Sequence, residues 1–161
     1  MAGMIPHHAQ ALIMTGWAPS HGASQALQLM CERMRISQTD EIKFMRTWLL
    51  DRGQFVPAAD ATHMKMERDG MTHEMLMPGM LNEAEMAALD KARGREFDRL
   101  FLQGMIKHHG GAITMVEDLY KAYGAMQDDF VYLFVSDVFA DQSVEIERMQ
   151  EMLAALGGGT K

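Results

Sequence analysis

The chain contains an internal repeat, and this repeat constrains the fold more than any other feature of the sequence. Two hexapeptides, at residues 3–8 and 104–109, each read Gly-Met-Ile, one variable residue and His-His. Further matches follow in the same order after each hexapeptide: Ala11 and Ala112, Met14 and Met115, Gln38 and Gln142, Glu41 and Glu145, Met45 and Met149, and Gly53 and Gly157. Matching blocks in the same order indicate a tandem duplication.

Each copy is predicted to form a helical hairpin. In the first hairpin, residues 1–53, a short helix through Met14 reaches a turn with Gly and Pro at residues 16–22. A long helix then follows and ends at Gly53, because glycine is the usual residue just beyond a helix.

The second hairpin is predicted over residues 83–157. Asn82 offers its side chain as an N-cap, with an acid three residues later as in a capping box. Apolar residues at helical spacing continue to a turn near Gly124, and a last helix covers about residues 127–156. No alternation typical of strands is found. Two helical hairpins predict an all-α four-helix bundle, with residues 1–161 as a single domain.

Residues 54–82 connect the two hairpins, and this linker is longer than most helix connections in a bundle. It holds several side chains that could bind a metal ion: His63, Met64, Met66, Met71, His73, Met75, Met77 and Met80. Core-forming aliphatic residues are few in the linker, so packing explains these thioethers poorly. We therefore predict that the linker contributes metal ligands.

Methionine is the unusual component of the sequence, with 18 residues in 161. A thioether can fill a gap in a core or bind a soft metal ion. The single cysteine, Cys31, excludes an internal disulfide and any cysteine-cluster metal site. Cys31 is predicted to be a core residue of the second helix, together with Met30 and Met34.

Charge and hydropathy exclude other classes of function. A formal net charge of −7 argues against nucleic acid and anionic membranes as partners. No apolar run approaches the roughly 20 residues that a membrane span needs. No nucleophile–base pair, phosphate-binding loop or dinucleotide motif is found, so catalysis has no positive support.

Helical geometry divides the motif residues into pairs. Met105 and His109 are one turn apart on the face predicted to be buried, close enough to hold one ion. His108 and Met115 are about 10 Å apart along the helix axis, so they need a ligand from another segment to share an ion. The duplication predicts the same relations for their counterparts, which are Met4 with His8 and His7 with Met14. Whether the two motifs share a site is left open.

Ligand softness selects the metal ion. Thioether and imidazole without thiolate favour Cu(I), and by extension Ag(I), while Zn or Cu(II) is possible at the histidine pairs. A di-iron centre in such a bundle needs Glu-x-x-His on two helices. No histidine of this chain has a glutamate three residues before it, so a di-iron centre is excluded.

Three acidic residues on the long helices are candidates for orienting the histidines. Glu41 and Glu145 occupy matching positions in the two copies, and Asp141 lies one turn before Glu145. Each could be an ordinary surface acid, or it could accept the second N–H of a metal-binding histidine.

The repeated blocks also carry a resemblance to a known family. Residues 4–8 (Met-Ile-Pro-His-His), 77–80 (Met-Pro-Gly-Met), 97–102 (Phe-Asp-Arg-Leu-Phe-Leu) and 105–112 resemble the bacterial family catalogued as domain of unknown function number 305, in its two-repeat form. The resemblance implies a ferritin-like bundle, usually exported to the periplasm or cell surface, and some members are associated with copper or silver binding and resistance. It implies ligand roles for these residues: His7, His8, Met14, His108, His109 and Met115.

These observations predict a non-enzymatic protein that sequesters or delivers Cu(I) or Ag(I) outside the cytoplasm, with metal ions and a metal-transfer protein as partners. One alternative is a metal-dependent oxidoreductase on the same bundle, for example one that oxidises Cu(I). Another is a bundle whose Met-rich surface docks a partner. The first residues show no signal-peptide pattern, yet the first motif lacks the helix that precedes its second copy, so we expect a trimmed sequence.

Overall fold

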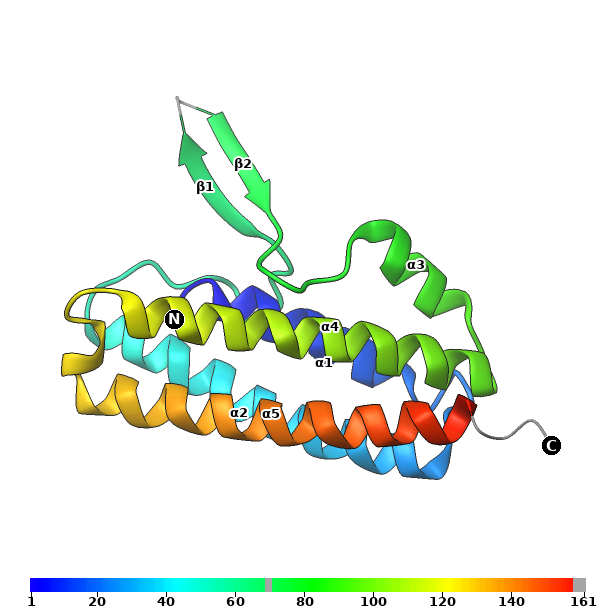
Figure 1. Ribbon diagram of the computed structural model, residues 1–161. Coiled ribbons are helices and arrows are strands. Elements are labelled where there is room, and N and C mark those ends of the chain that lie inside the picture. The colour runs from blue at the N-terminus through cyan, green and yellow to red at the C-terminus, as the bar shows by residue number, and fades with distance from the viewer. Residues whose placement is uncertain (69–70, 158–161) are drawn as a thin grey trace.

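The computed structural model describes residues 1–68 and 71–157, with the side chains of residues 65–73 outside the description. Its framework is a bundle of two helical hairpins: α1 (Met4–Trp17) with α2 (Gln25–Asp51), and α4 (Gly94–Lys121) with α5 (Asp129–Gly157). Figure 1 shows α1 and α4 in one layer and α2 and α5 in the other. The predicted all-α four-helix bundle is confirmed.

Local sequence explains where these helices begin and end. The hydroxyl of Ser24 caps α2 by accepting from the amide of Leu27, at 3.4 Å. Gly53, just beyond α2, has φ +60°, and Gly124, between α4 and the short 3-10 helix η1 (Ala125–Gln127), has φ +77°. Glycine adopts these left-handed conformations without steric cost, so both predicted helix ends are confirmed.

A β-hairpin in the linker contradicts the expectation of no strands. Strand β1 (Met64–Arg68) pairs antiparallel with β2 (Met71–Met75), and Met64 faces Met75 in the backbone register. Figure 1 shows the hairpin projecting from the bundle rather than packing along it. Apolar and polar residues alternate along a strand when one face of its sheet is buried. A projecting hairpin has no buried face, so its strands need not show this alternation.

The second hairpin also differs from its prediction, because the helix that begins after Asn82 is short. Helix α3 (Glu83–Lys91) starts at the predicted capping box, but Ala92 and Arg93 are extended and Gly94 has φ +56°. The chain therefore turns before α4 begins. In Figure 1, α3 lies against the outer side of α4 rather than in the bundle.

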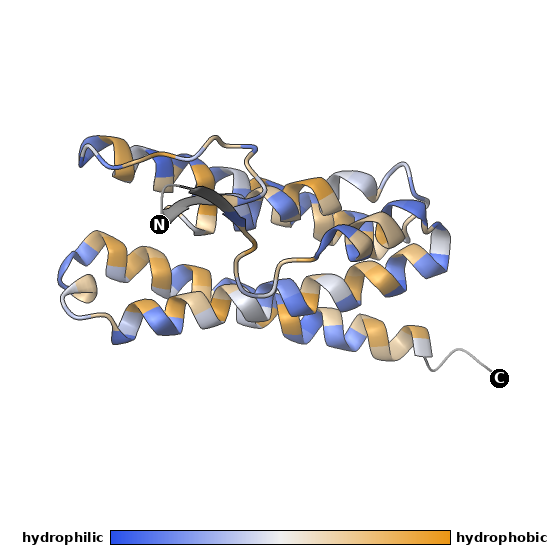
Figure 2. Ribbon diagram, turned by 90° about the horizontal axis from the view of Figure 1, so that it is seen from above, coloured by the Kyte–Doolittle hydropathy of each residue, from blue (hydrophilic) through white to orange (hydrophobic). Residues whose placement is uncertain are grey.

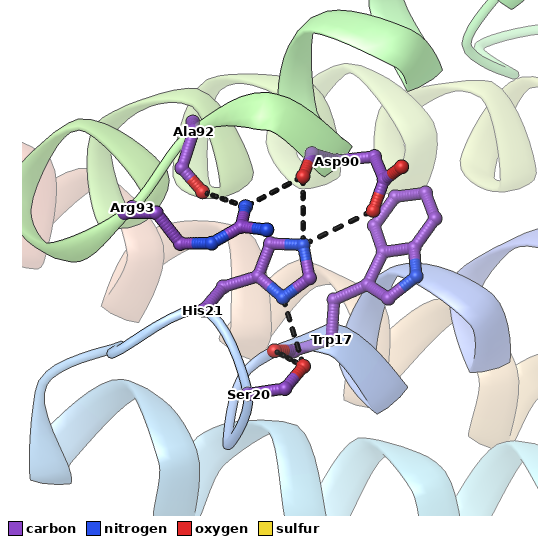
Figure 3. Close-up of polar contacts among 6 residues, drawn as sticks. All are labelled: Trp17, Ser20, His21, Asp90, Ala92 and Arg93. Carbon is purple, nitrogen blue, oxygen red and sulfur yellow. Dashed lines mark hydrogen bonds and ion pairs between the residues drawn. The ribbon is translucent and has the colours of Figure 1, made fainter.

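The turn between α1 and α2 holds this break in place. The ring of His21 contacts both the main-chain and side-chain oxygens of Asp90 through Nε2, at 2.9 and 3.1 Å, and Ser20 through Nδ1, at 2.9 Å (Figure 3). The carbonyl of His21 accepts from the amide of Gly94, at 2.8 Å. Nε2 of His21 thus joins the two halves of the chain, while Nδ1 is held by Ser20 within the turn.

The core consists of two apolar clusters. One surrounds Phe97 and Phe101 and includes Cys31 and Met34, as predicted; the other contains Ile5 and Val116. Figure 2 shows apolar and polar residues alternating along the helices, as expected for helices with one buried face. No helix among the described residues has the length and apolarity needed to cross a bilayer.

Candidate metal centre

The two His-His motifs meet inside the bundle. His7, His8 and His109 are completely buried, and His108 is 1% exposed. The rings of His7 and His108 lie 3.8 Å apart between centroids, and each lies 6.1 Å from the ring of its own sequence neighbour. The question that helical spacing left open is therefore answered: the two motifs form one cluster of four imidazoles, which we call the histidine cluster.

The arrangement follows from helix geometry, because consecutive residues of a helix point about 100° apart. His7 and His108 face each other across the contact of α1 with α4, while His8 and His109 point toward the glutamates of α2 and α5. Helical spacing predicts that His108 lies on the flank of the buried face of its helix. In the structure His108 is buried, because α1 packs against that flank.

Backbone carbonyl oxygens accept from the two facing histidines. Nε2 of His7 donates to the carbonyl of Pro78 in the linker, at 3.0 Å, and Nε2 of His108 donates to the carbonyl of His7, also at 3.0 Å. A carbonyl oxygen can only accept, so the proton of each neutral ring is on Nε2.

Carboxylates accept from the other two histidines. Nε2 of His8 lies 2.5 Å from Oε2 of Glu41, and Nε2 of His109 lies 2.6 Å from Oε2 of Glu145. These are the contacts for which the two glutamates were candidates. Asp141, the third candidate, is exposed and makes no such contact among the described residues. Partial burial and the charges of Glu41 and Glu145 raise its pKa.

The second ring nitrogen, Nδ1, is buried without a hydrogen-bond partner in all four rings of the histidine cluster. In a neutral ring with its proton on Nε2, Nδ1 carries a free lone pair. A buried polar atom left without a partner costs about 1–3 kcal/mol, and native proteins hold few of them. Four such atoms in one cluster are unused imidazole donors, and no three of these side chains are grouped to hold a single ion.

Burial keeps the facing imidazoles neutral. Burial and the proximity of His8 lower the pKa of His7 to about 3. Burial, followed by the proximity of His7 and His109, lowers the pKa of His108 well below its usual range. Glu41 behaves differently: burial alone would raise its pKa, but its bonds from His8 and Ser37 outweigh this and lower it.

These shifts predict that the metal-free protein loses stability in mild acid. An unfolded histidine takes up its proton near pH 6.5, whereas folded His7 does so only near pH 3. The unfolded state therefore binds more protons than the folded state below pH 6.5. As the pH is lowered, the free energy of unfolding decreases by up to about 1.4 kcal/mol per pH unit for each such histidine. Urea unfolding at pH 7, 6 and 5 measures this slope. His7→Asn should reduce it, and equal stability at the three pH values would contradict the prediction.

The predicted thioether ligands of the two motifs are distributed between the ends of the bundle. Because α1 and α4 run antiparallel, Met4 shares one apolar cluster with Met115, while Met14 shares the other with Met105. Three of them are buried, and Met115 is half-buried. The predicted pairing of Met4 with His8 and of Met105 with His109 stays a prediction.

A short part of the linker, residues 77–81, crosses α1 and α4 beside the histidine cluster, and we call it the strap. Its Leu81 exchanges two backbone hydrogen bonds with the side chain of Gln10 on α1, both at 2.8 Å. Its Gly79 rests on α4, so close that a Cβ there would lie 2.7 Å from the Cα of Gly111. The strap is thus bound to both helices, and this attachment places the Pro78 carbonyl at His7.

The other predicted linker ligands divide into three groups. Met77 and Met80 belong to the strap, where the sulfur of Met80 accepts from the amide of Met77 at 3.2 Å. His63 and Met64 line a hollow at the base of the β-hairpin, and Met75 is 47% exposed. The side chains of Met66, Met71 and His73 lie outside the described residues.

Metal cages built from His, Cys, Asp or Glu side chains alone are absent from the part of the chain that the structure describes. No three His, Cys, Asp or Glu side chains among those residues are grouped to hold one ion. Burial, followed by the charge of Asp98, raises the pKa of the Cys31 thiol to about 12, so no thiolate is available at neutral pH. The donors outside such a cage are pairs of imidazole nitrogens and the thioether sulfurs.

Comparison with known proteins confirms the resemblance. The model of the family described as Domain of unknown function (DUF305) matches residues 1–153. The chain belongs to the DUF305 family. No curated protein sequence shows significant similarity to it.

Solved DUF305 structures share the fold. A DUF305 fragment from Deinococcus radiodurans superposes with a TM-score of 0.75 at 24% identity, over 94% of this chain and 91% of that one. The structure "CopM in the Cu(I)-bound form" superposes with a TM-score of 0.72 at 26% identity, over 96% and 93%. "CopM in the Ag-bound form", obtained by co-crystallization, gives 0.68 at 27% identity, over 94% and 90%.

Sequence reasoning missed three parts of this DUF305 site: Gln10, the Pro78 carbonyl and Gly111. Every residue has a carbonyl group, so the sequence does not mark Pro78 as a hydrogen-bond acceptor. The sequence does mark Gln10 and Gly111, because they occupy matching positions in the two repeats but are different residues. The mismatch marks the place where the strap crosses both helices.

Proposed function

We propose that this DUF305 protein binds Cu(I) or Ag(I) in its histidine cluster and holds the ion for sequestration or delivery. The observation that carries the proposal is the set of four buried Nδ1 atoms without partners. Each ring is oriented by a bond from its Nε2, the arrangement in which metal-binding histidines are usually held. Helical spacing predicts that Met4 and Met105, one turn before His8 and His109, are the thioethers that assist.

The surroundings suit a soft monovalent ion. Imidazole and thioether are donors that Cu(I) accepts, whereas Mg²⁺ and Ca²⁺ need oxygen ligands. An ion in the cluster loses its hydration, and the nearby carboxylates of Glu41 and Glu145 offset part of the cost of its charge. Further support comes from the CopM structures with Cu(I) and with Ag, at 26% and 27% identity to this chain.

The proposal includes a location outside the cytoplasm, which the resemblance to the family implies. There a protein of this kind would limit free copper or silver, or pass the ion to a metal-transfer protein. Cu(II) and Zn are further candidate ions at the histidine pairs, because imidazole suits both, and a structure of CopM in the Cu(II)-bound form is 26% identical to this chain.

An anaerobic titration of the metal-free protein with Cu(I), against a chromophoric Cu(I) chelator, tests the proposal. We expect a dissociation constant well below 1 µM, which corresponds to a binding free energy more favourable than about −8 kcal/mol. Binding no tighter than micromolar would exclude the proposed role.

A further inference from the structure

A second group of methionines lies at the end of the bundle where α1 begins. A cavity of about 80 Å³ is lined there by Met1, Met4, Met45 and Met115, and its remaining walls are apolar side chains of α4 and α5. No histidine of the described residues lines it. We call it the thioether cavity.

The thioether cavity is unusual because methionine normally prevents such voids. Protein cores pack with few gaps larger than a water molecule, and the flexible methionine side chain fills irregular space. Here four methionines surround a gap and leave it open. The side chains of the lining are all apolar or thioether groups.

The matching end of the other repeat has two phenylalanines beside its methionines. The repeat counterparts of Met4, Met45 and Met115 are Met105, Met149 and Met14, and all three counterparts are fully buried. They belong to the apolar cluster around Phe97 and Phe101. The same three thioether positions are therefore packed at one end of the bundle and line a cavity at the other.

The strap contributes to this difference. A Cβ on Gly3 would lie 2.9 Å from the sulfur of Met77 and 3.5 Å from the methyl of Met115. A Cβ on Gly104, the matching residue, would instead lie 3.0 Å from a methyl of Leu81. The strap thus supplies a sulfur at the cavity end and an aliphatic side chain at the other end.

We propose that the thioether cavity is a second binding site, specific for a soft monovalent ion such as Ag(I) or Cu(I). Met4, Met45 and Met115 supply the ligands, and Met77 lies at the rim beside Met115. Sulfur is the only donor that their side chains offer, so ions that need oxygen or nitrogen ligands are rejected. The cavity exceeds the roughly 30 Å³ that a water molecule occupies, so a bare ion fits without moving the helices. The inference rests on the proposed function only in assuming the same type of ion.

A pair of matched double variants tests the proposal. Met45→Leu with Met115→Leu removes two ligands of the cavity, and Met149→Leu with Met34→Leu makes the same chemical change in the other apolar cluster, at residues without a predicted ligand role. Methionine-to-leucine changes keep the volume and cost under about 1.5 kcal/mol each, so both proteins should fold. Native mass spectrometry during Ag(I) titration should show one ion fewer in the first variant and the wild-type number in the second. Equal numbers in the two variants would overturn the proposal.

A second measurement separates this site from the histidine cluster. In protein labelled with ¹³C at the methionine methyls and carrying His8→Asn and His109→Asn, Ag(I) should still shift the resonances of Met45 and Met115. Unshifted resonances would overturn the second site. Failure of the histidine cluster itself would appear differently, as histidine variants that bind the wild-type number of ions.

Discussion

Replacing His108 and His109 together by asparagine is expected to weaken Cu(I) binding by at least about 100-fold. The change removes two of the four free Nδ1 lone pairs from the histidine cluster. Losing an outer partner of a metal ligand costs about 10–100-fold, and losing two ligands should cost more. Asparagine keeps a donor for the acceptors that the imidazoles satisfied. Anaerobic competition with a Cu(I) chelator measures the effect.

His21 provides the matched control. It is 5% exposed, nearly as buried as the cluster, but both its ring nitrogens have partners (Figure 3). His21→Asn should therefore leave Cu(I) affinity unchanged, even if it lowers stability. Glu41→Gln should fall between the two, with a loss of about 10–100-fold, because it alters only the partner of His8. Wild-type affinity in the His108 and His109 variant would mean that the four imidazoles only fill the core.

Replacing Gly111 by alanine is expected to lower the free energy of unfolding by about 3 kcal/mol, the upper end of the usual cost of overpacking. A Cβ at Gly111 would collide with the carbonyl group of Pro78 and with Gly79. These are backbone atoms of the strap, and the strap is also held by Gln10, so it cannot yield as a flexible side chain would. Urea unfolding of the metal-free protein measures the loss.

Replacing the neighbouring glycine by alanine is expected to change the free energy of unfolding in the opposite direction. Gly110 lies in the same helix, and a Cβ there would meet nothing within 4 Å. Gly110→Ala should raise the free energy of unfolding by up to about 1 kcal/mol, the difference in helix propensity. Gly111→Ala should also weaken Cu(I) binding, since displacing the strap withdraws the Pro78 carbonyl from His7. Wild-type stability in Gly111→Ala would show that the strap moves freely.

The parts of the fold that could be predicted depend on side chains in regular patterns. The repeat and its helical spacing predicted both hairpins and the burial of His109. The matching positions of Glu41 and Glu145 marked them as candidates for the contacts that they make with His8 and His109. In each case the side chains recur at a regular spacing, and helical periodicity places residues at that spacing on one face of the helix.

The parts that could not be predicted depend on backbone atoms or on contacts between distant segments. The carbonyls of Pro78 and His7 accept hydrogen bonds that any residue at those positions could accept. The break before α4 depends on the carbonyl of His21, more than 70 residues earlier in the chain. The thioether cavity exists because four segments leave a space, and no single stretch of sequence encodes a space.

The contact between His7 and His108 has an implication for the origin of this architecture. The two residues are repeat counterparts, and their ring centroids lie 3.8 Å apart with the rings tilted by 38°. In a symmetric homodimer, a residue meets its own copy in this way only at the two-fold axis. The bundle therefore has the geometry of an ancestral hairpin dimer joined into one chain. In a fused chain the two halves no longer have to be identical. His7 donates to the linker and His108 donates to α1, so each half can evolve its own affinity for metal.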